Sequence, residues 1–287
     1  MTDVIIIGAG PAGISASLYT KRANLETIVI SNNTSALLKT DKIENYYGFP
    51  EPISGPELNR RGIDGAKRLG VKFINGEVVS LDFDGNFIVN TGNNKYKAQA
   101  LLLATGSRRL APEIDGIREF EGKGISYCAV CDAFFFKKKN VAVLGSGEYA
   151  LHEAQVLLNT ANSVTVLTNG EKITAEFPKN ISVDTRKIQS FNGNDKLERI
   201  EFADGSNTDT SGVFIAYGVA GTAALAKKLG AVTDGNNIRI NENMQTTIKG
   251  MYAAGDCTGG LLQISKAVYE GAKAGVEIIK YVKTLQK

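Results

Sequence analysis

The sequence has few of the side chains that bind metal ions, with one histidine, His152, and three cysteines among 287 residues. Two of those cysteines, Cys128 and Cys131, are separated by two residues, a spacing found in redox-active disulfides and in half of a zinc site. A zinc site needs four ligands, and the other candidates, His152 and Cys257, belong to no paired ligand motif. We therefore interpret Cys128 and Cys131 as a redox pair and expect no metal. A metal site and chance spacing are the alternatives.

Long apolar runs and a strong net charge are also absent. No apolar span reaches the roughly 18 residues that cross a membrane, and the short run at residues 4–7 follows no basic segment of the kind that begins a signal peptide. The net charge is only +3, and no stripe of Lys and Arg with interleaved aromatics suggests nucleic-acid binding. We expect a cytoplasmic protein with neither a membrane nor a nucleic-acid partner. In that compartment a lone CxxC is more often catalytic than structural.

A glycine-rich turn near the N-terminus carries the first cofactor signal. The β-branched run at residues 4–7 precedes the sequence GAGPAG at residues 8–13, which we call the first glycine turn, and a helix to about Ala23. In a dinucleotide site the first glycine permits the tight turn, the second admits the pyrophosphate and the third lets helix and strand pack closely. A second strand, Thr27–Ile30, ends without the acid that usually binds the adenosine ribose.

The next part of the chain predicts a helix and several strands. The helix covers about residues 55–69, and turn residues separate short strands that follow it. These strands are expected at 71–74, 77–82, 86–90 and 95–98. Another buried strand, at 100–103, ends at Ala104-Thr105-Gly106, where the small side chains let a cofactor approach.

A second strand, turn and helix follows the CxxC motif. Residues 145–150, which we call the second glycine turn, follow a strand at 141–144 and precede a helix to about Leu158. Further strands are expected at 163–167, 181–183, 197–202 and 212–216, with no long helix between Thr168 and Ile181. Finally, a strand at 251–254 ends in Gly255-Asp256, and a helix begins near Ile264. An acid at that strand end can accept a hydrogen bond from a cofactor hydroxyl.

Five motifs in this order resemble the low-molecular-weight thioredoxin reductases over nearly the whole chain. They are the first glycine turn, Ile43-Glu44-Asn45, Ala104-Thr105-Gly106, Cys128-Ala129-Val130-Cys131-Asp132 and Ala254-Gly255-Asp256. The resemblance implies an α/β flavoprotein disulfide reductase of two domains. Residues 1–112 and 243–287 would form a Rossmann-like FAD-binding domain, and residues 113–242 a smaller, inserted Rossmann-like domain that carries the CxxC. The family also implies a homodimer.

The resemblance assigns roles to individual residues. Cys131 is expected to exchange electrons with the flavin, Cys128 to attack the thioredoxin disulfide, and Asp132 to act as the acid–base group that thiol–disulfide exchange requires. The residues expected to bind FAD are Gly8, Gly10, Pro11, Ala12, Gly13, Asn45, Thr105, Gly106, Gly255, Asp256, Gln263 and Ile264. Cys257 has no family role, and we interpret it as a small packed residue.

Other side chains around these motifs admit two interpretations. We interpret Phe134–Phe136 as core packing rather than as a wall of the flavin site, and Lys137–Lys139 as solvated rather than as a docking patch. Thr34-Ser35-Ala36 occupies the position of the family's usual Gly-Gly-Gln, and Tyr269 stands where a glycine is common near the flavin. We therefore expect a rearranged flavin environment, with Tyr269 or one of Tyr46 and Tyr47 beside the ring.

Departures from the family pattern concern the electron donor. NADPH-dependent members carry a segment with one histidine and two arginines that binds the 2′-phosphate, and residues 166–172 here contain no arginine. Between residues 160 and 185 the only cations are Lys172 and Lys179, and Glu171 would repel a phosphate. In the second glycine turn Tyr149 replaces a small residue, and His152 replaces an acid on the following helix. We interpret this turn as a remnant that packs helix on strand.

These departures make the chain most similar to flavin thioredoxin reductases that accept electrons from ferredoxin. We expect electrons from reduced ferredoxin to pass through FAD and the Cys128–Cys131 disulfide to thioredoxin. The outer parts of the chain are net basic and the middle part is net acidic, so an acidic ferredoxin would be drawn to the outer parts. The alternatives are an NAD(P)H-dependent thioredoxin reductase with an atypical nucleotide pocket, an oxidoreductase acting on another small redox protein, and a catalytically silent flavoprotein that binds or senses.

Overall fold

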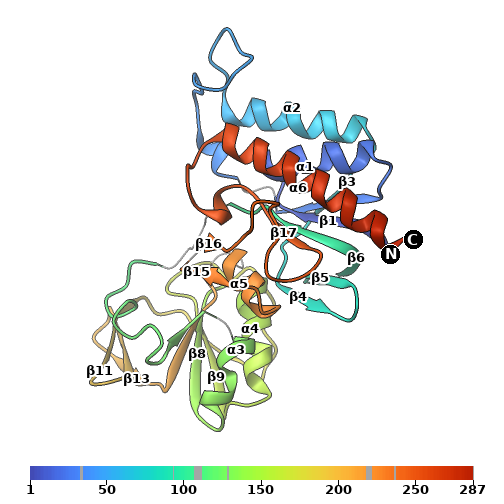
Figure 1. The fold of residues 1–287 in the computed structure, drawn as a ribbon. Helices are drawn as coiled ribbons and strands as arrows, with labels where there is room; N and C mark the ends of the chain where they lie inside the picture. Colours follow the sequence, from blue (N-terminus) through green and yellow to red (C-terminus); the bar gives the residue numbers. More distant parts are fainter. Residues whose placement is uncertain are drawn as a thin grey trace. The chain divides into compact units, whose positions relative to one another are not determined.

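The computed structural model describes residues 1–32, 35–92, 94–106, 112–127, 129–217, 222–235 and 237–286. The chain divides into two compact units, an outer unit of residues 1–109 and 221–287 and a middle unit of residues 110–220 (Figure 1). In each unit, parallel strands of a sheet carry a strand, glycine turn and helix, as expected of the α/β class. Among the described residues, no helix combines the length and apolar character that crossing a membrane requires.

The outer unit is a seven-stranded sheet covered by helices. Its strand order is β3-β2-β1-β6-β5-β4, and β17 pairs with β6. The strands are β1 (Thr2–Ile7), β2 (Thr27–Ser31), β3 (Lys72–Asn75), β4 (Ser80–Phe83), β5 (Phe87–Thr91), β6 (Asn94–Leu103) and β17 (Met251–Ala253). The helices are α1 (Pro11–Arg22), α2 (Gly55–Arg68), α5 (Thr222–Lys228) and α6 (Ile264–Leu285), with the short helices η1 (Ala36–Lys39) and η3 (Asp256–Thr258) and the hairpin β15 (Thr233–Asp234) and β16 (Asn237–Ile238).

Strand β6 is one strand where the sequence suggested two. Its first half pairs with β5 in antiparallel fashion, and its second half pairs in parallel with β1 and β17. No glycine or proline interrupts residues 95–103, so nothing ends the strand between Ala98 and Ala100. Its last residues, Leu101–Leu103, are fully buried and end at the predicted cofactor edge.

Helices α1, α2 and α6 lie side by side over one face of this sheet (Figure 1). The approach of α6 to α1 is close because two glycines face α1. A Cβ at Gly271 would lie 2.1 Å from the carbonyl oxygen of Ala12, and one at Gly275 would lie 2.9 Å from that of Ala16. This packing fixes the start of α6 beside the first glycine turn.

The middle unit combines two sheets. A parallel sheet has the order β10-β9-β8-β14-β7, and an antiparallel sheet has the order β11-β12-β13. The elements are β7 (Ile125–Ser126), α3 (Ala129–Asp132), η2 (Ala133–Phe136), β8 (Asn140–Leu144), α4 (Glu148–Leu158), β9 (Ser163–Leu167), β10 (Ser182–Asp184), β11 (Ile188–Gly193), β12 (Leu197–Phe202), β13 (Asn207–Asp209) and β14 (Gly212–Ile215). The segment between β9 and β10 contains no helix, as expected, whereas β11 and β13 were not expected.

The second boundary between the units lies earlier than the expected residue 242. Residues 222–235 and 237–242 pack with the outer unit, where α5 contacts β4 and β16 contacts η3. Leu225, Ala226 and Ile238 are buried by these contacts. The apolar side chains of this short segment therefore complete the outer core.

Candidate cofactor cleft and redox site

One cavity gathers most of the residues expected to bind the cofactor. It has a volume of about 340 Å³ and lies in the outer unit, where β1, β6 and β17 end. Every residue predicted to bind FAD lines it except Gly13: Gly8, Gly10, Pro11, Ala12, Asn45, Thr105, Gly106, Gly255, Asp256, Gln263 and Ile264. The sequence motifs, which span more than 250 positions in the chain, thus converge on a single cleft.

The three glycines of the first turn have different surroundings. Gly8 has a φ of 111°, and a Cβ there would lie 2.3 Å from the carbonyl oxygen of Ala104. A Cβ at Gly13 would lie 2.0 Å from the carbonyl oxygen of Gly8, so Gly13 serves helix-on-strand packing and does not line the cleft. A Cβ at Gly10 would meet nothing closer than 3.9 Å, because Gly10 faces the cleft.

The start of α1 offers a site for an anion. Gly10 caps the helix with extended backbone, no side chain caps it, and no acid stands in its first turn. The first N–H groups of a helix carry a partial positive charge and bind phosphate readily. The glycine turn and the helix therefore fit a pyrophosphate between them.

Opposite the glycine turn, two segments far apart in sequence meet. The amide of Asn45 donates a hydrogen bond to Oε1 of Gln263 at 3.1 Å, and both residues line the cleft. Ile264 packs on a small apolar cluster that contains Leu37, Ile43 and Ile53. These contacts hold the loop after η1 against the start of α6, and so shape the end of the cleft that is expected to hold the isoalloxazine ring.

Asp256 opens the short helix η3, next to a partly buried ion pair between Lys266 and Glu270. Glu270 accepts a hydrogen bond from the backbone N–H of Gly255 at 2.8 Å, and Lys266 donates to the carbonyl oxygen of Gly255 at 3.0 Å. Lys266 and Glu270 are themselves 3.2 Å apart. Burial raises the pKa of Asp256; Lys266 opposes this shift, and Glu270 adds to it. These contacts fix the backbone of Gly255, directly before Asp256.

A second cavity, of about 320 Å³, continues from the first past Ala9 and Ser35, which line both. Ser31 from the end of β2 lines it, together with Asn59, Asp64 and Lys67 from α2. Sequence reasoning missed these α2 residues, because no motif marks the polar face of a helix. They supply polar groups where β2 lacks the usual acid. Two adjoining cavities of this size fit the two halves of FAD.

Part of the predicted redox motif falls outside the described residues. Cys128 is not among the described residues. Cys131 lies in α3, but its side chain is not described. Asp132 is described, and its Oδ2 accepts a hydrogen bond from the hydroxyl of Ser126 at 2.6 Å. The expected acid–base group is therefore anchored to β7.

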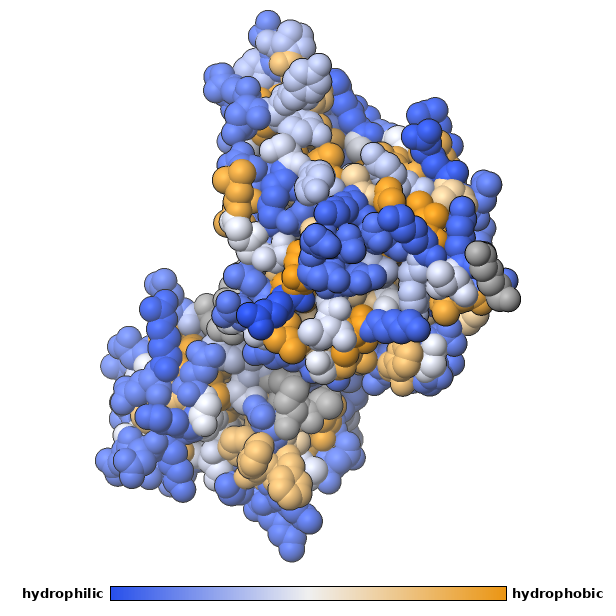
Figure 2. Space-filling model, viewed as in Figure 1, coloured by the Kyte–Doolittle hydropathy of each residue, from blue (hydrophilic) through white to orange (hydrophobic). Residues whose placement is uncertain are grey.

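The aromatic run after the motif does not fill the core as expected. Phe134 and Phe135 are 76% and 67% exposed and contact each other edge to face. Only Phe136 packs inward, with its ring 5.1 Å from that of Phe214. Figure 2 shows an apolar patch over the part of the middle unit where Figure 1 places α3. Lys137–Lys139 are exposed, as expected for solvated side chains.

The protein's own groups contact the second glycine turn, although Ser146, Gly147 and Glu148 in it are partly exposed. Tyr149 is only 3% exposed at the start of α4. The backbone N–H of Thr174 donates to the carbonyl oxygen of Ser146 at 2.9 Å. The hydroxyl of Tyr217, beyond β14, donates to Oε1 of Glu171, beyond β9, at 2.7 Å. Since β14 and β9 flank β8, this bond crosses the edge at which the turn lies. Burial and Glu171 raise the pKa of Tyr217 to about 12.

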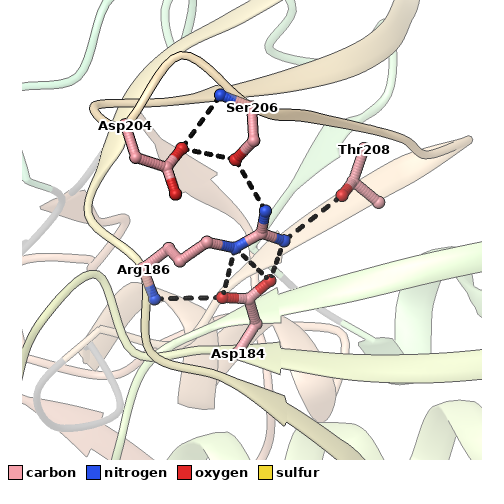
Figure 3. Close-up of polar contacts among 5 residues, drawn as sticks. All are labelled: Asp184, Arg186, Asp204, Ser206 and Thr208. Atoms are coloured by element: carbon pink, nitrogen blue, oxygen red, sulfur yellow. Dashed lines mark hydrogen bonds and ion pairs between the residues drawn. The ribbon is translucent and has the colours of Figure 1, made fainter.

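One arginine lies near this edge, just beyond the segment considered in the sequence. Arg186 forms an ion pair with Asp184 at the end of β10, and its Nη1 donates to the hydroxyl of Ser206 at 2.7 Å (Figure 3). Its guanidinium also stacks on the ring of Phe202, 3.8 Å from the centroid. Arg186 lowers the pKa of Asp184. The guanidinium is thus committed to partners within the middle unit.

Cys257 is confirmed as a packed residue. It is 1% exposed, and its thiol donates to the carbonyl oxygens of Ala254 and Leu103 at 3.3 and 3.4 Å. Burial raises its pKa to about 12. Tyr46 packs on the apolar cluster of Ile43, whereas Tyr47 and Tyr269 are exposed.

Known proteins resemble this chain along its whole length. Residues 2–271 match the family described as Pyridine nucleotide-disulphide oxidoreductase. The thioredoxin reductase of Bacillus subtilis (strain 168) is 35% identical over 307 residues, which cover 99% of this chain and 96% of that protein. The crystal structure of the atypical thioredoxin reductase TRi from Desulfovibrio vulgaris Hildenborough superposes with a TM-score of 0.93 at 39% identity, covering 99% of both chains.

A second similar structure is that of a Ferredoxin-Flavin Thioredoxin Reductase from Clostridium acetobutylicum. It has a TM-score of 0.73 and 29% identity, and the match covers 100% of this chain and 99% of that one. The family match covers most of the chain, and the Bacillus enzyme is 35% identical to it. The cleft with its glycine turn is what a family of dinucleotide-binding oxidoreductases requires. The chain therefore belongs to the low-molecular-weight thioredoxin reductases, FAD-binding members of the pyridine nucleotide-disulphide oxidoreductases.

Proposed function

We propose that the protein is a ferredoxin-dependent thioredoxin reductase. Electrons from reduced ferredoxin reach the Cys128–Cys131 pair through FAD in the outer unit and then reduce thioredoxin. The observation that carries this proposal is the Tyr217–Glu171 hydrogen bond, which crosses the sheet edge beside the second glycine turn. In a nucleotide-dependent enzyme, that turn is where NADPH would bind.

The geometry of the middle sheet opposes a bound dinucleotide. Ligands of such sheets bind beyond the carboxyl ends of the strands, next to the glycine turn. Here Tyr149 is buried in the turn, Thr174 is bonded to it, and the Tyr217–Glu171 hydrogen bond crosses the edge. A pyrophosphate would have to displace all three features.

The charges near this edge also oppose NADPH. A 2′-phosphate is best bound by a guanidinium that donates two parallel hydrogen bonds. Arg186 already uses its guanidinium on Asp184, Ser206 and Phe202. Lys172 and Lys179 are exposed, and neither can offer the planar fork of an arginine.

One of the similar structures supports the same donor, because it is that of a Ferredoxin-Flavin Thioredoxin Reductase from Clostridium acetobutylicum. The net positive charge of the outer parts of the chain complements an acidic ferredoxin.

The residues of the outer unit would bind and orient FAD, and FAD itself would supply the redox chemistry. When bound, FAD supplies a centre that accepts electrons one at a time and gives them up in pairs. Gly10 and the start of α1 bind the pyrophosphate, Asp256 accepts a ribityl hydroxyl, and Asn45 with Gln263 orients the ring.

The middle unit would carry out the disulfide chemistry. Two electrons and two protons convert the Cys128–Cys131 disulfide into two thiols, and Asp132 exchanges one of the protons. The Cys128 thiolate attacks the thioredoxin disulfide and forms a mixed disulfide. Cys131 then attacks the sulfur of Cys128, which restores the intramolecular disulfide and releases reduced thioredoxin. The exposed Phe134 and Phe135 provide an apolar contact for a protein substrate.

Anaerobic mixing of the holoenzyme with each donor tests the proposal. Reduced ferredoxin should bleach the flavin absorbance rapidly, and NADPH and NADH should not. Fast bleaching by NADPH would overturn the assignment in favour of the nucleotide-dependent alternative. The Cys128→Ser variant should still be bleached by ferredoxin but should no longer reduce thioredoxin. Full activity in that variant would contradict the role of Cys128.

A further inference from the structure

Helix α4 has two buried polar side chains that contact the redox segment. Tyr149 and Glu153 stand four residues apart, so they lie one turn apart on the same face of the helix. Tyr149 is 3% exposed and Glu153 is 1% exposed. A buried carboxyl group is costly unless it is hydrogen-bonded, so the partner of Glu153 is informative.

The partner of Glu153 is the backbone next to the first redox cysteine. Its Oε2 accepts a hydrogen bond from the backbone N–H of Ala129 at 2.7 Å. Ala129 directly follows Cys128, opens α3 and is fully buried. The contact is short, and water has no access to it, so it restrains the position of Ala129 strongly.

Tyr149 contacts the other side of the same cysteine. Its hydroxyl donates to the carbonyl oxygen of Tyr127 at 3.4 Å, a long and therefore weaker bond. Ser126, one residue earlier, donates to Asp132 at the far end of α3. The backbone is thus held before Cys128, after Cys128 and at the end of the motif.

We propose that Glu153, assisted by Tyr149, is a positioning residue for the Cys128–Cys131 pair. The helix that would face a pyrophosphate in a dinucleotide domain instead fixes the backbone on both sides of Cys128. This inference rests on the proposed redox role of the two cysteines. It goes beyond that role because it assigns a use to α4, whose glycine turn binds no nucleotide in the proposed function.

A restrained backbone has a defined effect on the redox equilibrium. Holding the two thiols near each other raises their effective concentration, which favours the disulfide over the dithiol. A disulfide restrains the same backbone by itself, so loss of the Glu153 contact frees mainly the reduced form. Glu153→Ala should therefore shift the equilibrium toward the dithiol.

Equilibration of the holoenzyme with glutathione redox buffers tests this inference. The dithiol fraction is measured by alkylation and mass spectrometry. We expect Glu153→Ala to shift the equilibrium roughly three- to tenfold toward the dithiol and Tyr149→Phe to shift it less, because its bond is longer. Glu153→Gln keeps an oxygen that can accept the Ala129 N–H and should stay within about twofold of the wild type. Gln155→Ala, on the exposed face of α4, is the matched control and should change nothing.

Each result has a defined meaning. Should Glu153→Ala fold and titrate as the wild type does, the positioning role is wrong, whatever its melting temperature. Glu153→Asp, whose shorter side chain cannot reach Ala129 without movement, takes its place if Glu153→Ala does not fold, and the same shift is expected. An equal shift in Gln155→Ala would make the effect a general response of α4 and would overturn the inference. A wild type that forms no reversible Cys128–Cys131 disulfide would contradict the proposed function itself.

Discussion

The two glycine turns of this protein share one sequence pattern and differ in what lies next to them. Both follow a parallel strand and open a helix, α1 in the outer unit and α4 in the middle unit. The first turn lines a cavity of about 340 Å³. In the second, Tyr149 is buried and Thr174 is bonded to the turn. A glycine turn therefore shows that a strand and a helix pack closely, and only the side chains around it decide whether a ligand can enter.

Substitution of the second glycine of each turn tests most directly whether the turn binds a cofactor. It should give the largest effect of the changes considered, a loss of FAD binding. Gly10→Ala places a methyl group in the cleft without meeting a protein atom closer than 3.9 Å, so the protein should fold normally but bind FAD about 100-fold more weakly. Gly147→Ala meets the hydroxyl of Thr174 at 3.1 Å, a side chain that can move, and should bind FAD as the wild type does. Flavin absorbance per mole of protein, with circular dichroism for folding, measures both effects. Equal flavin content in the two variants would remove the distinction between the turns.

Removal of the Tyr149 side chain tests whether this residue alone prevents a nucleotide from binding at the second glycine turn. Tyr149→Ala removes a buried ring and should lower the free energy of unfolding by about 3–5 kcal/mol. It should not create reduction by NADPH, because the Tyr217–Glu171 bond and the engaged Arg186 remain. Chemical denaturation and anaerobic flavin bleaching measure the two outcomes. Rapid bleaching by NADPH in this variant would show that the second turn is a working nucleotide site blocked by one side chain.

The Tyr217–Glu171 hydrogen bond beside the second turn should make a small, pH-dependent contribution to the stability of the folded protein. The pKa of Tyr217 rises from an ordinary value of 10.0 to about 12 in the folded protein, so folding favours the neutral phenol. The stabilisation is complete below pH 10 and is lost as the pH rises to 12. Tyr217→Phe should therefore melt below the wild type at pH 8, and the difference should narrow between pH 10 and pH 12. A constant difference across that range would mean that Tyr217 does not bond to Glu171 through its hydroxyl.

Short-range sequence patterns predicted the cleft well. The first glycine turn and the strand ends at Thr105 and Asp256 were each recognisable from a few neighbouring residues. Parallel strands bring their carboxyl ends to one edge, so these residues had to meet once the strands paired. The hydrogen bond between Asn45 and Gln263 joins loops that the motifs had already marked.

Predictions that needed knowledge of packing were less successful. Gly13 was expected both to pack helix on strand and to bind the cofactor; it packs helix on strand, and it does not line the cavity. Phe134 and Phe135 were expected in the core but are exposed, because the short helix η2 turns only Phe136 inward. Residues 221–242 were expected in the middle domain, yet their few apolar side chains pack with the outer unit. Composition shows that such segments have apolar residues, but it does not show which core receives them.

The sequence by itself determined the family, the two α/β units and the redox spacing of Cys128 and Cys131, because these depend on residue types at fixed short intervals. Only the tertiary structure shows which groups contact the second glycine turn and the helix that follows it. Glu153 bonds to Ala129, Tyr217 to Glu171 and Arg186 to Ser206. Each of these partners lies 20 or more residues away in the chain, so the contacts arise only when the strands are assembled. The Tyr217–Glu171 contact crosses the edge at which the second glycine turn lies, and the Glu153 contact connects α4 to Ala129 of the redox segment.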